Sequence, residues 1–407
     1  MASTILSASN AARHPLRSPA FRLLWIGRTV SNLGDQFYLV ALPWLVLQLT
    51  NSSLALGTIM MTATIPVAVL MLVGGAVSDR FSARKIWMLT TSARTLSVTL
   101  VGLLVWFHAL QLWHVYVLAL LFGVADAFAA PAAQTFLPSL VDREQLPAAN
   151  SVTQMTQQLT TILGPAPAGL VIRAFGVAWA FFIDAFSFLF VMAALWRLPD
   201  PQRSQTAAKK GLLHSIAEGL HYINSDAALR SLLILAAALN FCLSGPISIG
   251  LAWIAKQNFA SPVAFSIFVS AVALGSLIGA ALAGLYKPRR RGVTMIVVSA
   301  LIALFTGLLG LLAHAWLLAV VLLAMGAAAG FLNVHIIAWF QQRVEREMLG
   351  RATSVLMFAA VGLAPVSLLL AGLAVKWNLT AMFVSSAVLM FLAAAVAALT
   401  KPVREIQ

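Results

Sequence analysis

Residues 141–152 read VDREQLPAANSV, and residues 344–355 read VEREMLGRATSV. Seven of the twelve positions are identical, and the copies lie 344 − 141 = 203 residues apart in a chain of 407 residues. The same offset carries Gly169 onto Gly372. The sequence therefore predicts two fused and similar halves.

The composition places both halves in a lipid bilayer. Hydrophobic residues make up 61% of the chain and charged residues only 9%, a balance that no water-soluble core of this size requires. Hydrocarbon offers the backbone no hydrogen-bond partner, so spans are helices or closed barrels. The apolar runs have the helical length of about 20 residues. Duplication in such a chain is typical of secondary transporters, whose two bundles move about one central site.

We expect an all-α membrane protein with twelve transmembrane helices in two pseudo-symmetric six-helix bundles. The first six spans are placed near residues 21–48, 54–77, 86–108, 112–135, 149–172 and 176–196, and the second six near 229–254, 261–285, 293–313, 316–340, 352–374 and 378–400. The expected domains are a cytoplasmic N-terminal tail (1–20), the first bundle (21–196), a cytoplasmic linker (197–228), the second bundle (229–400) and a cytoplasmic tail (401–407). An amphipathic stretch of the linker, near residues 216–223, is expected to lie along the membrane surface.

Basic residues predict the orientation, because Lys and Arg accumulate in cytoplasmic loops. Arg173, Lys256 and Lys376 fall on one side of the membrane, and nearly all the others fall on the other side. Both termini are therefore expected in the cytoplasm, with the protein in a bacterial-type inner membrane. The net charge of +14 does not indicate nucleic-acid binding, because the basic residues are spread over loops without a soluble domain to present them.

No enzyme, metal site or cofactor is expected. The seven histidines are scattered, and no Ser/His/Asp arrangement or metal-ligand spacing stands out. Cys242 is the single cysteine, which excludes disulfides and cysteine clusters within one chain. A phosphate-binding Gly-x-x-x-x-Gly-Lys loop is missing from the sequence, which argues against ATP as the energy source.

A charged motif, GAVSDRFSARK, occupies residues 75–85 between spans two and three. Its Gly75, Asp79, Arg80 and Arg84 resemble the loop signature of the major facilitator superfamily, with departures at positions 82 and 83. The resemblance implies a cytoplasmic gate that latches the two halves together. An Asp at a helix end, flanked by guanidinium groups, can bond to a neighbouring helix terminus in one conformation and release it in another. The alternative is that the basic residues only set topology.

A second motif, GPAPAG, occupies residues 164–169 of span five. It resembles the Gly-Pro-x-x-Gly-Gly pattern of exporters in this superfamily, with Ala168 replacing one glycine. Gly164, Pro165 and Gly169 predict a kinked and tightly packed helix, because proline removes a backbone hydrogen bond and glycine allows close helix approach. The resemblance favours export over import.

Further similarity covers nearly the whole chain. Residues 19–23, Arg28, Gly34-Asp35, residues 130–132 and the two repeated stretches are similar to the branch that holds enterobactin exporters and macrolide efflux proteins. This resemblance implies the fold and the transport class, and it leaves the substrate open.

Ionisable residues inside spans need a reason to persist, because each costs roughly 2.5–3.5 kcal/mol at the bilayer centre. Asp35 lies near that centre in the first span and is our candidate proton-coupling carboxylate; a substrate that competes for its ionised form would give antiport. The alternative is a permanent pair with Arg28, two turns earlier.

Arg94 and Asp126 are expected to pair, because they lie at similar depth in adjacent antiparallel helices. Asp184, midway along span six, is interpreted as structural.

Neutral polar residues in the spans predict the lining of a substrate pathway. They are Gln154, Gln157 and Gln158 in span five, Asn240 in span seven, and Asn333 and His335 in span ten, with Tyr38 as an aromatic wall near Asp35. Hydrogen bonding between helices explains each of them as well as substrate contact does.

Together these features predict a secondary active exporter of amphiphilic small molecules, drug-like or siderophore-like, that works by proton antiport and alternating access. Its expected partners are a small-molecule substrate, protons and the bilayer, and we expect a monomer. Two alternatives remain. One is an uncoupled lipid or metabolite facilitator, in which Asp35 only packs. The other is a membrane sensor that transports nothing.

Overall fold

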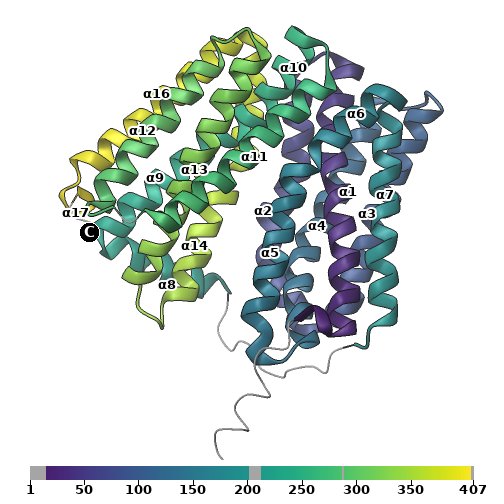
Figure 1. Cartoon of the computed structure of the whole chain (residues 1–407), viewed down its shortest axis with the longest axis horizontal. Helices are drawn as coiled ribbons and strands as arrows, with labels where there is room; N and C mark the ends of the chain where they lie inside the picture. The colour runs from purple at the N-terminus through teal and green to yellow at the C-terminus, as the bar shows by residue number, and fades with distance from the viewer. Residues whose placement is uncertain (1–14, 201–211, 287, 405–407) are drawn as a thin grey trace, which may run out of the picture.

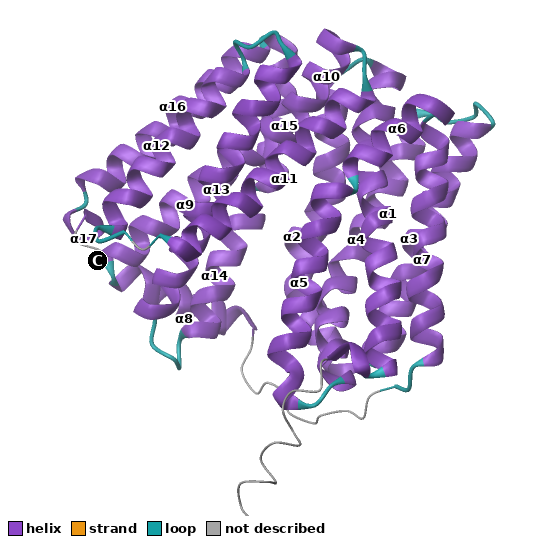
Figure 2. Ribbon diagram, in the orientation of Figure 1, coloured by secondary structure: helices purple, strands orange, loops and turns teal. Residues whose placement is uncertain are grey.

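The computed structural model describes residues 15–200, 212–286 and 288–404, and the side chains of these residues except 71–80 and 212–216. The described chain is helical and contains no strand (Figure 2). The helices of the first half are α1 (Pro19–Thr50), α2 (Ser53–Arg80), α3 (Ala83–Trp106), α4 (Leu112–Phe136), α5 (Leu146–Leu163), α6 (Pro165–Phe175) and α7 (Val177–Arg197). Short 3-10 turns precede α1 and link α4 to α5; they are η1 (Pro15–Arg17), η2 (Leu137–Leu140) and η3 (Arg143–Gln145).

The second half repeats this order after the linker helix α8 (Leu212–Ser225). Its elements are α9 (Ala227–Gly245), η4 (Pro246–Gly250), α10 (Leu251–Phe259), α11 (Pro262–Leu285), α12 (Arg291–Leu309), α13 (Ala315–Arg343), α14 (Leu349–Val361), α15 (Ala364–Trp377), α16 (Leu379–Leu399) and α17 (Lys401–Arg404). Each half packs into a bundle of its own (Figure 1). The predicted fold class, twelve spans in two similar bundles, is confirmed.

Glycine and proline interrupt three of the twelve spans. The fifth breaks at Gly164 between α5 and α6, the seventh passes through the π-helical turn η4 after Gly245, and the eleventh breaks between α14 and α15. Proline removes one backbone hydrogen bond and its ring crowds the preceding turn. Yet α1 continues unbroken through Pro43, the position 203 residues before Pro246. Proline alone does not decide where a span breaks.

Ten helical segments of the described chain are long and apolar enough to cross a membrane. The spans outside this set are α1 and α5–α6. Both carry polar side chains along their length, including Asp35 in α1 and the glutamines of α5. These two spans therefore hold Asp35, Tyr38 and the three glutamines that were predicted to form the site of the first bundle.

The two ends of the molecule differ, and we name them by their charge. The basic end holds η1, η3 and α8, and the opposite end holds the α3–α4 turn, Gly176 and Ala260. The bundles lie against each other at the opposite end and diverge toward the basic end (Figure 1). Within the described residues, the hydrogen bonds between bundles run from Ser53 Oγ to the Gly372 oxygen (2.9 Å), from Gln257 Nε2 to Asn51 Oδ1 (2.8 Å) and from Gln158 Nε2 to the Ala273 oxygen (3.4 Å).

Glycines let the bundles touch at the opposite end. A Cβ on Gly57 of α2 would lie 2.7 Å from the Leu368 oxygen and 3.0 Å from the Gly372 Cα of α15. A Cβ on Gly169 of α6 would lie 2.9 Å from the Pro262 oxygen of α11. Because Gly169 and Gly372 correspond through the 203-residue offset, the same backbone contact is made twice, once from each half.

The linker helix α8 packs on α14 and α9 of the second bundle. Glu218 lies 2.7 Å from Arg351, and Arg343 donates to Asp226 Oδ2 at 2.9 Å. Although partial burial raises the pKa of Asp226, the hydrogen bonds from Arg343 and from the backbone N–H groups of residues 228 and 229 outweigh it and lower that pKa. We expected this stretch on the membrane surface. The second copy of the repeated motif holds α8 against the second bundle through Arg351, and its placement along the membrane surface stays a prediction.

Candidate functional site

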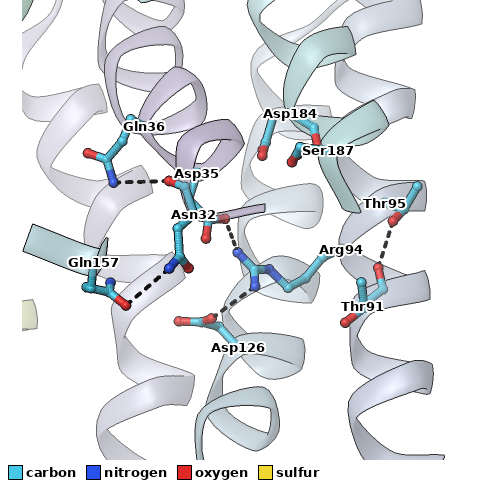
Figure 3. Close-up of polar contacts among 10 residues, drawn as sticks. All are labelled: Asn32, Asp35, Gln36, Thr91, Arg94, Thr95, Asp126, Gln157, Asp184 and Ser187. Carbon is cyan, nitrogen blue, oxygen red and sulfur yellow. Dashed lines mark hydrogen bonds and ion pairs between the residues drawn. The ribbon is translucent and has the colours of Figure 1, made fainter. Parts of the chain in front are cut away.

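The predicted charged residues of the first bundle meet at one guanidinium group (Figure 3). Arg94 Nη2, from the middle of α3, lies 2.5 Å from Asp35 Oδ1 of α1, and Arg94 Nη1 lies 3.7 Å from Asp126 Oδ1 of α4. The Arg94 side chain is only 12% exposed, whereas Asp35 is 31% and Asp126 44% exposed. One buried cation therefore holds two carboxylates, both of which keep some access to their surroundings.

Aromatic rings enclose the guanidinium. Arg94 Cζ lies 4.7 Å from the ring centre of Phe122 and 4.6 Å from that of Phe188, within the range of cation–π attraction. Tyr38 stacks on Phe122 at 4.4 Å and meets the edge of Phe181 at 6.2 Å. Apolar walls strengthen electrostatic interactions because they exclude water. Tyr38 thus lines the charged cluster, close to Asp35 as the sequence suggests.

The ion pair of Asp35 differs from the alternative that the sequence offered. Arg28 lies with its Cζ 6.0 Å from the ring centre of Trp87, while Asp35 bonds to Arg94. Spacing along α1 suggested Arg28 because both residues share that helix. The partner comes instead from α3, whose rotation about its own axis cannot be read from span limits.

A polar path continues from Asp35 toward α5. Asn32 Nδ2 donates to Gln157 Oε1 at 3.3 Å, and Gln36 Nε2 donates to the backbone carbonyl oxygen of Asn32 at 3.4 Å. Gln158 reaches the backbone of α11 in the other bundle, and Gln154 is exposed nearer the basic end. The predicted α5 glutamines therefore extend the site from the charged cluster toward the boundary between bundles.

The predicted polar residues of the second bundle do not join this cluster. Asn240 is exposed and donates to the Ala236 oxygen of its own helix at 2.9 Å, and Asn333 is exposed. His335 is buried, with Nδ1 3.0 Å from the Phe331 oxygen and its ring stacked on Phe331 at 4.3 Å. Both contacts are with Phe331 of the same helix, so packing within α13 accounts for His335.

The GPAPAG segment packs on both sides of the α5–α6 break. A Cβ on Gly164 would lie 2.5 Å from Gln36 Cγ of α1, so glycine brings the break directly against the helix that carries Asp35. Pro165 begins α6 and is buried. Gly169 meets α11 as described above. The segment therefore joins the charged cluster to the contact between bundles.

The predicted cytoplasmic gate is described only in part. The side chains of Gly75, Asp79 and Arg80 lie outside the described residues. Arg84 donates from Nε to the Leu195 oxygen (2.6 Å) and from Nη2 to the Trp196 oxygen (2.8 Å), and so satisfies the C-terminal carbonyls of α7. Arg84 thus bonds to a neighbouring helix terminus, but within its own half and not across the two halves.

Asp184 is the residue of this region that the sequence analysis interpreted as structural. Its carboxyl group lies beside the cluster in Figure 3, is fully buried, and has no hydrogen-bond partner among the described residues. Position in a peripheral span suggested a structural role. The surroundings of the Asp184 carboxyl depend on the facing helix α1, because Gly34 packs directly against Asp184 and Ser187.

Comparison with known proteins identifies the family. Residues 10–407 match the model of the family described as transmembrane secretion effectors. The multidrug efflux pump Tap of Mycobacterium tuberculosis (strain ATCC 25618 / H37Rv) is 28% identical over 372 residues, covering 88% of each chain. The enterobactin exporter EntS of Citrobacter koseri is 28% identical over 344 residues, covering 82% of this chain and 80% of that protein.

Solved structures agree on the fold. The nucleoside transporter NupG superposes with a TM-score of 0.75 at 12% identity, covering 96% of this chain and all of that one. An inward-facing bacterial homologue of ferroportin superposes with a TM-score of 0.70 at 15% identity, covering 93% and 98%. With a family model that spans the whole described chain and a fold shared with these transporters, the protein belongs to the transmembrane secretion effectors of the major facilitator superfamily, and it is a membrane transporter rather than an enzyme.

Proposed function

We propose that the protein exports amphiphilic small molecules by proton antiport, with Asp35 as the coupling carboxylate. The observation that carries this proposal is the shared guanidinium: Arg94 holds Asp35 at 2.5 Å and Asp126 at 3.7 Å. A proton on Asp35 neutralises that carboxylate, so Asp126 remains as the ionised partner of Arg94. The cluster therefore has two arrangements that differ by one proton.

A substrate can exploit the same carboxylate. Asp35 and Tyr38 lie one turn apart on α1, and Tyr38, Phe122 and Phe188 surround the cluster with aromatic surface. An amphiphilic molecule with a positive group fits a carboxylate beside aromatic rings. Binding to ionised Asp35 then competes with binding of a proton, and this competition is the requirement for antiport. The names of the relatives Tap and EntS support drug-like or siderophore-like substrates and the outward direction.

Alternating access accounts for where the bundles touch. Contacts at Gly57, Gly169 and Gly372 join the opposite end, whereas helices spread toward the basic end (Figure 1). Basic loops remain on the cytoplasmic side, so we assign the basic end to the cytoplasm together with both termini. In this assignment the described state faces inward. Closing the basic end while separating the glycine contacts would face the site outward.

An uncoupled facilitator is the second candidate, and one observation favours it. Because Arg94 already satisfies Asp35, the carboxylate has a structural role without any proton transfer. This candidate predicts transport that does not depend on a pH gradient.

Proteoliposomes with an imposed pH gradient separate the two candidates. The substrate probe is ethidium, a lipophilic aromatic cation, and the variants are Asp35→Asn and Asp142→Asn. Asp142 lies exposed in a loop at the basic end, so its substitution removes a carboxylate without touching the cluster. We expect gradient-driven flux in the wild type and in Asp142→Asn, and gradient-insensitive flux in Asp35→Asn. Wild-type flux that ignores the gradient would end the antiport proposal.

A further inference from the structure

Asp184 occupies an unusual position for a carboxyl group. It lies on α7 with no exposed surface, and α7 packs on α1, α3 and α6. A Cβ on Gly34 of α1 would lie 2.9 Å from Asp184 Oδ1, so the glycine that precedes Asp35 leaves the space in which this carboxyl sits. Ser187, one turn along α7, donates to the Asp184 backbone oxygen at 2.7 Å and leaves the carboxyl alone.

Neither oxygen of this carboxyl has a partner within the described chain. An ionised carboxylate without hydrogen bonds or a counterion is strongly unfavourable in an apolar interior, and such a group takes up a proton instead. Arg94, the nearest buried cation, is already engaged by Asp35 and Asp126. In the described arrangement Asp184 therefore carries a proton.

The charges that face Asp184 come from the helices around it. Those of the cluster are Asp35 and the ionisable Tyr38 on α1, Arg94 on α3 and Asp126 on α4, and Asp184 interacts electrostatically with Asp35 and Arg94. The remaining charged groups lie toward helix ends; they are Arg22 and Arg28 on α1, Arg84 and Lys85 on α3, and Arg173 in the exposed last turn of α6. Arg94 is thus the cation that an ionised Asp184 could recruit with the shortest movement.

Asp184 and Asp126 lie at different heights along the membrane. Asp184 lies 197 − 184 = 13 residues from the basic end of α7, and Asp126 lies 136 − 126 = 10 residues from that end of α4. At the helical rise these are about 20 and 15 Å. Figure 3 accordingly places Asp184 and Asp126 on different sides of Arg94. Asp184 therefore lies nearer the opposite end than Asp126 does, whereas Asp35 lies about level with Asp184, because Gly34, the residue before Asp35, packs against the Asp184 carboxyl.

We propose that Asp184 is a second proton-binding site, which passes its proton to Asp35. In this step the O–H bond of Asp184 breaks and an O–H bond forms on Asp35, while Arg94 moves from Asp35 to the newly ionised Asp184. The charge of the cluster is unchanged. Asp35, which is 31% exposed, then releases the proton toward the basic end. The inference rests on the proposed antiport and adds a second carboxyl to the path of the proton.

The test exploits the resemblance between Asn and a protonated Asp. Asp184→Asn keeps the shape of the neutral carboxyl but cannot give up a proton. In ethidium-loaded proteoliposomes we expect it to lose gradient-driven flux on the order of 100-fold, the scale of a removed proton-transfer group, and to keep ethidium exchange without a gradient. Ser187→Ala is the matched control, because it alters packing on the same buried face of α7 without removing an ionisable group. It should retain both activities.

Each outcome decides the inference. Gradient-driven flux in Asp184→Asn equal to that of the wild type would overturn it and leave Asp184 as a neutral packing group. If Asp184→Asn loses both activities, Asp184→Glu decides, because recovery of driven flux supports the carboxyl and continued loss in both contradicts it. A wild type without any driven flux would instead defeat the proposed antiport, so the two failures are distinguishable.

Discussion

The two bundles share their scaffold but not their charge. The first bundle carries Asp35, Arg94, Asp126 and Asp184 inside its helices. The positions 203 residues later are apolar, and they hold Ala238, Val297, Ala329 and Ala387. The packing between the bundles does repeat, because Gly169 and Gly372 make corresponding contacts. In the proposed antiport, the duplicated helices would supply the movement between states, and the chemistry of coupling would belong to the first bundle.

Arg94 provides the strongest test of this difference. Arg94→Ala leaves two carboxylates without their buried cation, and a broken buried pair costs about 3–5 kcal/mol. We expect a stability loss near the lower limit, because Asp35 and Asp126 remain partly exposed. Val297→Ala, at the corresponding position of the second bundle, should change stability by less than about 1 kcal/mol because Val297 is half exposed. Thermal unfolding of both purified variants measures the contrast, and equal losses would contradict it.

Gly57 tests the packing that both halves share. In Gly57→Ala the new methyl group would lie 2.7 Å from the Leu368 oxygen, and such overpacking costs typically about 1–3 kcal/mol. The contact at the opposite end should therefore open more often. Labelling of Ser53→Cys by a membrane-impermeant maleimide measures this, against the single native Cys242, which is buried. Gly284→Ala is the control, since its Cβ meets nothing within 4 Å. An unchanged labelling rate in Gly57→Ala would argue against a moving contact.

Much of this architecture follows from the sequence, and the limits are physical. Apolar length located the spans, because the bilayer fixes how long a helix must be. The similar depth of Arg94 and Asp126 in adjacent helices was the basis for predicting that they lie close together. Depth did not choose between Arg28 and Arg94 for Asp35, because that choice depends on the rotation and tilt of α3 against α1. The isolation of Asp184 likewise depends on Gly34 of a different helix, and no pattern along α7 encodes it.

The linker offers a smaller test of how the second half is anchored. Glu218 pairs with Arg351 at 2.7 Å, and both side chains are about one-third exposed. Glu218→Gln removes the charge and keeps the shape, so we expect a stability loss of less than about 1 kcal/mol. Hydrogen exchange of α8 should rise while that of α1 stays the same. Equal exchange of α8 in the variant and the wild type would show that apolar packing alone holds this helix.

The smallest expected effect concerns acid. Because the hydrogen bond from Arg343 lowers the pKa of Asp226 in the folded state, its contribution is present above the unfolded value of about 3.9 and is lost as pH falls through the folded pKa. Asp226→Asn keeps a residue that caps α9 well but does not titrate. Between pH 5 and pH 3, the stability of Asp226→Asn should therefore fall less than that of the wild type, by a difference of a few tenths of a kcal/mol. Parallel acid profiles for the variant and the wild type would contradict the assignment.

Competition at Asp35 is the central claim, and proton release on substrate binding tests it most directly. The purified wild type in weakly buffered solution, at a pH where Asp35 is partly protonated, should release protons when ethidium binds. Asp35→Asn should bind ethidium without that release. Equal proton release from both proteins, or binding to the wild type without any release, would contradict the claim that substrate and proton exchange at this carboxylate.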